Sequence, residues 1–214
     1  MNLRNKDRKG YKHTSVGWIP EDWEEVNLKA ISQIYFSGVD KKSFDLEKSV
    51  FLCNYMDVYK NDYIRNDIQF MQATASDSEI QKFKLRKGDI LITKDSETPD
   101  DIGVPSIVME DLENVICGYH LAMIRPKLNE IDSVFLGKAI ASKYVSNQFT
   151  SLANGATRFG LSTSAVENAK IPLPPLAEQK KIAEILSKWD KAIEQTQKLI
   201  GSKEKLKKGL MQKL

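Results

Sequence analysis

The feature that most constrains the fold is a cluster of three prolines followed by a long stretch without any proline. Pro172, Pro174 and Pro175 cannot lie inside a helix, and each favours an extended backbone at the residue before it. From residue 176 onward the chain is rich in Glu, Gln, Lys, Ala, Ile and Leu, which form helices readily. We therefore predict a stiff proline segment over residues 172–175, followed by one helix of about 55 Å.

Apolar residues recur along this helix with a seven-residue spacing. Such a repeat is typical of a helix that pairs with another helix along its length. Lys203 at a core position of the repeat and Gly201 in the middle of the helix predict looser pairing in the distal half. The alternative is an amphipathic helix that lies along its own domain. The residues expected in a helix–helix contact are Ile182, Ile185, Leu186, Trp189, Ile193, Leu199, Ile200, Leu206 and Leu210.

The rest of the chain has the composition of an ordinary globular protein, with 41% hydrophobic and 29% charged residues. No apolar run approaches the roughly 20 residues that span a bilayer. The N-terminus is charged and has no apolar stretch behind it, so we expect neither a secretory signal nor a membrane segment. The two cysteines, Cys53 and Cys117, give no disulfide framework and favour a cytoplasmic location.

The net charge of +3 is unevenly distributed. Residues 1–12 carry +4, residues 13–171 carry −6 and residues 172–214 carry +5. The body of the protein is therefore mildly acidic, and its overall charge does not indicate a nucleic-acid partner. Any prediction of DNA binding must depend on local clusters of residues.

Short apolar runs bounded by polar, Gly and Pro residues fill the chain before the prolines. Residues 87–93 give the clearest strand prediction, with a tight turn feeding an apolar run. Residues 106–109 and 114–117 are expected to form a hairpin, and the tyrosine-bearing segment 55–63 a loop. Helical spacing of apolar residues predicts a helix over 134–149.

These elements predict an α+β fold in which short strands and a few helices form one globular domain. We expect three parts: a flexible N-terminal arm over residues 1–17, the globular domain over residues 18–171, and the proline segment with its long helix over residues 172–214.

Residue patterns for catalysis and metal binding are incomplete. A Pro-Asp-Asp sequence at residues 99–101 lacks the Glu-x-Lys that would complete a nuclease site. Cys117 and His120 have the spacing of half a zinc site, but only the distant Cys53 and His13 could complete it. No glycine-rich loop joins a strand to a helix as a nucleotide site requires. We therefore expect no enzymatic activity, no cofactor and no metal.

Three polar loops carry the groups with which proteins contact DNA. Base readout uses guanidinium, amide and hydroxyl groups on protruding segments, with lysines nearby for phosphates. The alternative is that these are ordinary solvated loops. The candidates are Thr157, Arg158 and Phe159 in a loop between two glycines, Lys94 and Ser96 in a second loop, and Lys41 and Lys42 in a third.

The same stretches resemble a known family. The motifs are Trp18-Ile-Pro-Glu-Asp-Trp-Glu, Lys87-Gly-Asp-Ile-Leu-Ile-Thr-Lys-Asp-Ser, Gly155-Ala-Thr-Arg-Phe-Gly-Leu and Ile171-Pro-Leu-Pro-Pro-Leu-Ala-Glu-Gln-Lys-Lys-Ile-Ala-Glu-Ile-Leu. In this order they resemble the specificity subunits of type I restriction–modification enzymes, over nearly the whole chain. The last motif is the most specific of the four.

The resemblance implies a non-catalytic DNA-recognition protein. Its globular domain would be a target recognition domain, and its long helix would space two such domains and bind the methyltransferase subunits. A full-length subunit carries two domains and two helices, whereas this chain resembles half a subunit. We therefore expect an antiparallel homodimer that reads a bipartite inverted repeat in double-stranded DNA and recruits methyltransferase and restriction subunits.

Two other classes of function remain open from the sequence. A coiled-coil interaction or structural protein would account for the long helix but would leave the globular domain without a role. A DNA-modifying enzyme would require a cofactor site, and binding of S-adenosylmethionine by the isolated chain would favour it.

Overall fold

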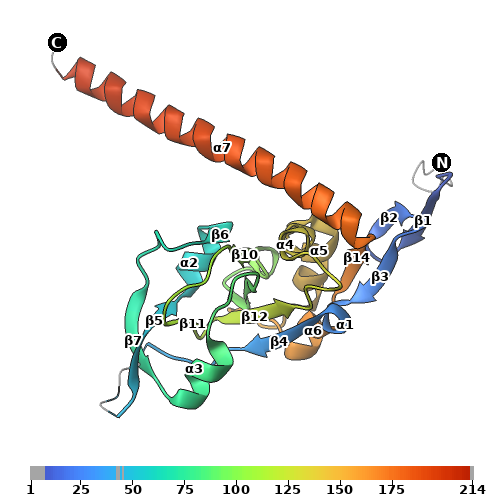
Figure 1. The fold of residues 1–214 in the computed structure, drawn as a ribbon, viewed down its shortest axis with the longest axis horizontal. Helices are drawn as coiled ribbons and strands as arrows, with labels where there is room; N and C mark the ends of the chain where they lie inside the picture. Colours follow the sequence, from blue (N-terminus) through green and yellow to red (C-terminus); the bar gives the residue numbers. More distant parts are fainter. Residues whose placement is uncertain (1–7, 42–43, 45, 213–214) are drawn as a thin grey trace.

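The computed structural model describes residues 8–41, 44 and 46–212 of the 214-residue chain. A globular part built of strands and short helices precedes one long helix that extends away from it (Figure 1). We call the globular part, residues 8–175, the head. This arrangement confirms the predicted α+β class with a long C-terminal helix.

A five-stranded sheet forms the centre of the head. Its order is β4 (Ser32–Phe36), β12 (Leu121–Pro126), β8 (Ile90–Thr93), β10 (Pro105–Val108) and β6 (Tyr63–Ile64), and only β10 and β6 are parallel. All of β8 is buried, so both faces of the sheet are covered. Ile90 and Ile92 join one apolar cluster and Leu91 joins a second, because successive side chains of a strand point to opposite faces.

A three-stranded sheet covers the face to which Leu91 points. Its order is β11 (Val115–Cys117), β5 (Lys48–Cys53) and β7 (Met71–Ala75). The helices α2 (Tyr55–Tyr59) and α3 (Asp77–Phe83) directly follow β5 and β7 in the chain, and they add Val58 and Phe83 to the same cluster. The second cluster therefore joins residues of both sheets.

Four helices supply about half of the buried residues of the cluster on the opposite face. They are α1 (Leu28–Ile31), α4 (Ser133–Ala141), α5 (Lys143–Leu152) and α6 (Thr163–Glu167). The single helix predicted over 134–149 is two helices, because Ser142 between them has an extended backbone. The Ser142 hydroxyl donates to the carbonyl of Ala139 at 2.7 Å, a local hydrogen bond that competes with helix continuation.

The N-terminal part described by the structure is more ordered than predicted. Strand β1 (Tyr11–Thr14) pairs antiparallel with β2 (Gly17–Pro20), so the expected flexible arm over residues 1–17 is wrong for this stretch. Residues 1–7 lie outside the described residues. The sequence signal was weak because β1 is polar and mostly exposed, so the hairpin depends on backbone hydrogen bonds and the turn at Gly17.

Two further predictions are wrong. The segments 106–109 and 114–117 do not form a hairpin, because β10 pairs with β8 and β6 while β11 pairs in parallel with β5. The predicted tyrosine loop contains α2, which begins with a capping box: the Asn54 backbone N–H donates to the Asp57 carboxylate at 2.8 Å.

The proline segment begins as a strand and ends at the start of the long helix. Strand β14 (Lys170–Leu173) pairs with β3 (Glu24–Asn27), and Pro172 lies in this two-stranded sheet, where an edge position tolerates a residue without an N–H. Pro175 then directly precedes α7 (Leu176–Met211), which has 36 residues. The long helix therefore leaves the head at the point that the three prolines predict.

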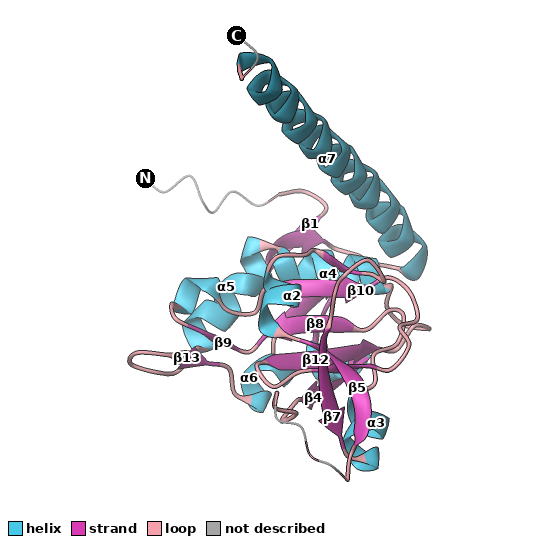
Figure 2. Cartoon of the chain, turned by 90° about the vertical axis from the view of Figure 1, so that its left-hand side faces the viewer, coloured by secondary structure: helices cyan, strands magenta, loops and turns pink. Residues whose placement is uncertain are grey.

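The first part of α7 packs against the head, and its distal part projects away from it (Figures 1 and 2). Ile182, expected in a helix–helix contact, packs instead against the core of the head next to buried Ala183. The other eight residues predicted for that contact have exposed fractions from 36% to 67%. They are Ile185, Leu186, Trp189, Ile193, Leu199, Ile200, Leu206 and Leu210.

Candidate nucleic-acid interface

The loop that carries Arg158 is closed at its base by backbone hydrogen bonds. The N–H of Asn154 donates to the carbonyl of Gly160 at 3.0 Å, and the reverse bond measures 2.9 Å. Gly155 has a φ of +151°, and a Cβ there would overlap the carbonyl of Arg158, so the turn requires glycine. Residues 155–158 are consequently exposed at the tip of a loop that protrudes beside β13 (Phe159–Gly160; Figure 2).

Two of the three polar loops predicted from the sequence meet here. Strand β13 pairs antiparallel with β9 (Asp95–Ser96), which sets Phe159 opposite Ser96 and Gly160 opposite Asp95. The N–H of Leu161 also donates to the carbonyl of Lys94 at 2.8 Å. A cavity of about 400 Å³ opens beside this pair of strands. It is lined by Tyr55, Met56, Asp95, Ser96, Glu97, Asp101, His120 and Arg158.

Lys94 and Ser96 are less available to a ligand than the sequence suggests. The Lys94 ammonium lies 3.1 Å from a carboxylate oxygen of Asp95 and 4.6 Å from the centre of the Tyr119 ring, and its side chain is 13% exposed. The same Asp95 oxygen is 2.8 Å from Nδ1 of His120. Ser96 is buried and accepts a hydrogen bond from the Thr98 N–H. The phosphate contact by Lys94 and the role of Ser96 stay predictions.

Helix α2 places Tyr55 at the cavity and Tyr59 against it, an arrangement that was not predicted from the sequence. The rings of Tyr55 and Tyr59 stack at 5.6 Å, and the Tyr59 hydroxyl donates to Asp101 at 2.8 Å. Burial and the charge of Asp101 raise the pKa of Tyr55, while the hydrogen bond to Asp101 raises that of Tyr59. Both phenols are therefore neutral at neutral pH. The four-residue spacing of the tyrosines, just after Asn54, was the available signal for a helix.

The third predicted loop lies elsewhere. Lys41 is exposed, and Lys42 lies outside the described residues. The backbone N–H of Phe44 donates to the Thr74 hydroxyl at 2.9 Å, which holds this loop against β7. No described residue of this loop lines the cavity beside Arg158, so the structure does not bring Lys41 to the same site.

The residues considered for a zinc site do not gather. Cys53 and Cys117 are opposite each other on β5 and β11 and both are buried, which raises the pKa of both thiols. His120 is paired with Asp95. Among the residues that the structure describes, no group of three His, Cys, Asp or Glu side chains could hold a metal. Within the same residues, no helix is long and apolar enough to cross a membrane.

Comparisons with known proteins agree with the motifs. The family model of the type I restriction modification DNA specificity domain matches residues 20–201, which include most of the head and much of α7. A protein of Methanocaldococcus jannaschii, assigned as the type I restriction enzyme MjaX specificity subunit, is 32% identical over 212 residues and is covered over 48% of its length. The EcoBI specificity subunit of Escherichia coli is 28% identical over 167 residues and is covered over 34%.

The matches cover 95% and 77% of this chain, which therefore spans about half or less of the length of these relatives. Solved structures share the fold at 18% identity. The HsdS subunit of Thermoanaerobacter tengcongensis aligns with a TM-score of 0.57, over 86% of this chain and 41% of that one. A chain from a study of complex assembly in the type I R-M system aligns with a TM-score of 0.59, over 82% and 40%. The chain belongs to the family of type I restriction modification DNA specificity domains.

Proposed function

We propose that this protein is the non-catalytic, sequence-specific DNA-recognition subunit of a type I restriction–modification system. The observation that supports the proposal is the family match, because it runs from the head into α7 and so includes both parts to which the proposal gives a role. The relatives named above are specificity subunits of such enzymes. Double-stranded DNA is therefore the proposed ligand of the head.

The protruding loop with Thr157, Arg158 and Phe159 is the part of the head best suited to enter a groove of DNA. Arg158 is exposed at its tip, and a guanidinium can bind guanine through two hydrogen bonds. The carboxylates of Asp95, Glu97 and Asp101 in the adjacent cavity would repel phosphates. They can, however, accept hydrogen bonds from cytosine amino groups, so this surface favours base edges over the phosphate backbone.

Helix α7 supports a two-fold dimer. Eight of the residues predicted for a helix–helix contact are exposed along it, and a soluble protein rarely leaves such a stripe without a partner. A second copy running antiparallel would cover the stripe on both chains. Because a two-fold dimer presents the same reading surface twice, its DNA site would be an inverted repeat with unread base pairs between the halves.

The same dimer would bind methyltransferase subunits along its paired helices. The methyltransferase subunits would in turn connect it to a restriction subunit. The rival proposal is a coiled-coil interaction protein without DNA specificity, for which the same exposed stripe is the supporting observation.

Selection of bound sequences from random duplex DNA, with the methyltransferase partner present, distinguishes the two. We expect enrichment of one gapped inverted repeat. A protein that enriches no sequence while still forming dimers would favour the coiled-coil alternative. The variant Arg158→Ala should enrich a degenerate base within each half-site and serves as the internal check on the reading surface.

A further inference from the structure

The first turns of α7 are fixed to the head by buried side chains, and Gln179 makes the hydrogen bonds among them. Gln179 is 1% exposed, and its amide accepts from the Asp132 N–H at 2.8 Å. It also donates to the carbonyls of Pro174, at 2.8 Å, and Glu130, at 3.2 Å. Both amide N–H groups and the amide oxygen of Gln179 therefore bond to the backbone of the head or of the proline segment. Gln179, with the packing of Ile182 and Ala183, therefore fixes where the helix starts, but contacts confined to its first two turns leave its direction less constrained.

A second attachment point lies three turns further along. Asp190 accepts hydrogen bonds from the Tyr63 hydroxyl and from the Lys138 ammonium, the latter at 2.8 Å. Lys138 comes from α4 and Tyr63 from β6, so two separate elements of the head hold one carboxylate of α7. The Lys138 ammonium also lies 5.2 Å from the centre of the Tyr63 ring. We call Tyr63, Lys138 and Asp190 the joint.

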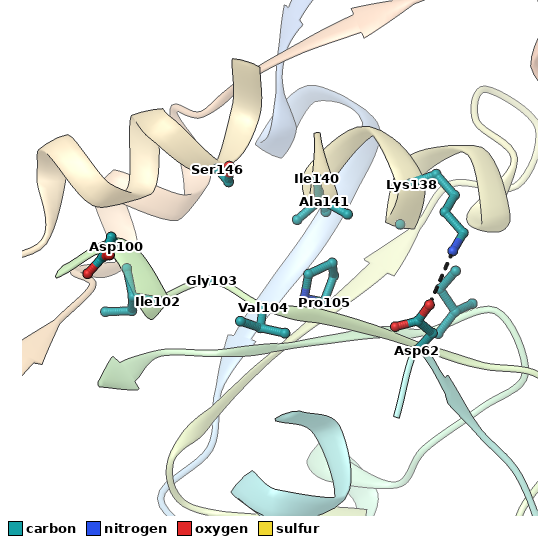
Figure 3. Close-up of a pocket in the computed structure, with 12 residues that line it drawn as sticks. Asp62, Asp100, Ile102, Gly103, Val104, Pro105, Lys138, Ile140, Ala141 and Ser146 are labelled. Carbon is teal, nitrogen blue, oxygen red and sulfur yellow. Dashed lines mark ion pairs between the residues drawn. The ribbon is translucent and has the colours of Figure 1, made fainter. Parts of the chain in front are cut away.

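The head also holds its own side of the joint in place. The Lys138 ammonium lies 3.6 Å from a carboxylate oxygen of Asp62, the residue before Tyr63. Figure 3 shows Lys138 reaching from its helix toward Asp62, at the edge of a cavity of about 230 Å³. This contact links α4 to the residue before β6 and therefore helps to hold the Lys138 ammonium in position for Asp190.

The charges of the joint persist at neutral pH. Burial acts to lower the pKa of Lys138, but the hydrogen bond to Asp190 and the nearby Tyr63 and Asp62 raise it overall. Burial acts to raise the pKa of Asp190, but the hydrogen bonds from Lys138 and Tyr63 lower it overall. The side chains of Lys138 and Asp190 are 18% and 23% exposed, so solvent screens their attraction less than that of a surface pair.

Beyond the joint, the helix is largely free of the head. Arg65 and Glu194 approach to 3.9 Å, and both side chains are well exposed. Among the residues that the structure describes, no hydrogen bond or ion pair links residues 195–211 to the head. The contacts around Gln179 at the start of the helix and the joint at Asp190 therefore define the direction in which the helix leaves.

The distances along the helix make this direction sensitive to the joint. At about 1.5 Å per residue, Asp190 lies about 16 Å from Gln179, and Met211 lies about 48 Å from it. A displacement of about 2 Å at Asp190 would therefore move the far end of α7 by about 6 Å. Along DNA this corresponds to about two base pairs, since each occupies about 3.4 Å.

We infer that the joint fixes the angle between head and helix, and that Tyr63, Lys138 and Asp190 are positioning residues for the spacing between the two half-sites. The inference rests on the proposed function, since it is the paired helices that would set this spacing. None of the three residues lines the cavity beside Arg158. Loss of the joint should therefore loosen the spacing without altering the bases read.

A distance measurement tests the angle without DNA. Spin labels on Glu113→Cys in the head and Lys205→Cys in α7 occupy exposed positions, whereas the native Cys53 and Cys117 are buried. The labelled chain is diluted with excess unlabelled chain, so that only distances within one chain contribute. We expect a single narrow distribution for the wild-type sequence.

Asp190→Ala removes the joint and adds a good helix former. Its distance distribution should broaden by about 6 Å, and Tyr63→Phe, which deletes only a hydroxyl, should broaden it less. Glu184→Ala is the matched control, because the ion pair that Glu184 makes is with Lys188 on the same helix, at 2.6 Å. Narrow distributions in both joint variants, equal to that of the control, would overturn the inference.

Sequence selection with the same variants tests the consequence for DNA. Asp190→Ala should recover the wild-type half-sites with gaps that vary over about two more base pairs, whereas Glu184→Ala should keep the wild-type gap. A loss of affinity with an unchanged gap would mean a merely structural role and would overturn the inference. A wild-type protein that selects no gapped site would instead overturn the proposed function, so the two failures are distinguishable.

Discussion

Arg158 and Lys94 lie on neighbouring segments, yet their side chains have different surroundings. Arg158 is exposed at the tip of a loop, whereas the Lys94 ammonium is held by Asp95 and the Tyr119 ring. An exposed guanidinium can reach base edges, while an ammonium held by a carboxylate must first leave its partner. The two residues should therefore respond differently to substitution.

Replacing Arg158 with alanine should weaken binding mainly to duplexes that carry the preferred DNA sequence. Loss of a two-bond contact to guanine is worth about 1–3 kcal/mol, or roughly 5- to 150-fold in affinity. Titration of matched and mismatched duplexes measures the effect. Arg86→Ala, also an exposed arginine of the head, is the control and should change little. Equal affinities and an unchanged sequence preference in Arg158→Ala would refute the assignment.

Lys94→Ala tests whether this lysine contacts a phosphate. If it does, affinity should fall equally for all sequences, and the slope of log affinity against log salt should decrease by about one. The measurement is the salt dependence of binding to matched and unmatched duplexes. A weaker affinity with an unchanged salt slope would instead indicate that Lys94 acts by holding Asp95 and has no phosphate contact.

The ion pair between Asp89 and Arg125 allows a prediction about thermal stability that does not depend on DNA binding. The buried carboxylate of Asp89 accepts from Nε and Nη2 of Arg125, each at 2.8 Å, and from the Arg86 N–H. Asp89→Ala leaves a partly buried guanidinium unpaired, which should cost about 3 kcal/mol. For a chain of this size the melting temperature should fall by about 6–12 °C.

Lys48→Ala is the control for this measurement. It breaks the pair with Asp77, in which both side chains are largely exposed, and such pairs contribute little. Similar melting temperatures for Asp89→Ala and Lys48→Ala would contradict the account of the Asp89–Arg125 pair.

At the scale of elements, the sequence predicted the structure of single segments well. It did not predict which segments pair when they are far apart in the chain. Strand β8 follows a tight turn and is a short apolar run, and α7 follows three prolines. Both were correctly predicted because the information lies within each segment. The parallel pairing of β11 with β5 joins segments more than 60 residues apart, and a strand of three residues has too little periodicity to indicate its partner.

The same difference between local structure and long-range pairing applies to the candidate site. The glycine-bracketed loop was recognisable from Gly155 and Gly160, and the structure describes it as a protruding turn. Its position beside Lys94 depends on β9 and β13, strands of two residues each, which leave no pattern in the sequence. Helix α2, whose Tyr55 lines the cavity, is five residues long, which is too short for a helical spacing of apolar residues to be recognised.

The exposed stripe of α7 predicts the oligomeric state. Replacing Ile185, Trp189 and Ile193 with glutamate would put unpaired charge into a helix–helix contact and should convert dimers to monomers. Their exposed fractions of 48%, 67% and 53% mean that the fold of a single chain should tolerate the change. Sedimentation at micromolar concentration gives the mass. A wild-type protein that sediments as a monomer would refute dimerisation through this helix.

At the scale of the whole molecule, the proposed dimer is two reading heads held apart by paired helices. Each head would read a short block of bases, and heads on the same face of the duplex would lie about one helical turn, 34–36 Å, apart. Paired helices of about 54 Å can accommodate this separation. The length of α7 beyond the joint should then set the unread gap, and the head alone should set the half-site sequence.

Deletion of one heptad, residues 196–202, tests this claim most directly. The deletion keeps the seven-residue register, lies beyond Glu194, which makes the last ion pair between α7 and the head among the described residues, and shortens each helix by about 10 Å. Sites selected by the shortened protein should keep the wild-type half-sites as an inverted repeat, with a gap shorter by about three base pairs. An asymmetric site, or a gap that stays the same length after the deletion, would contradict the account.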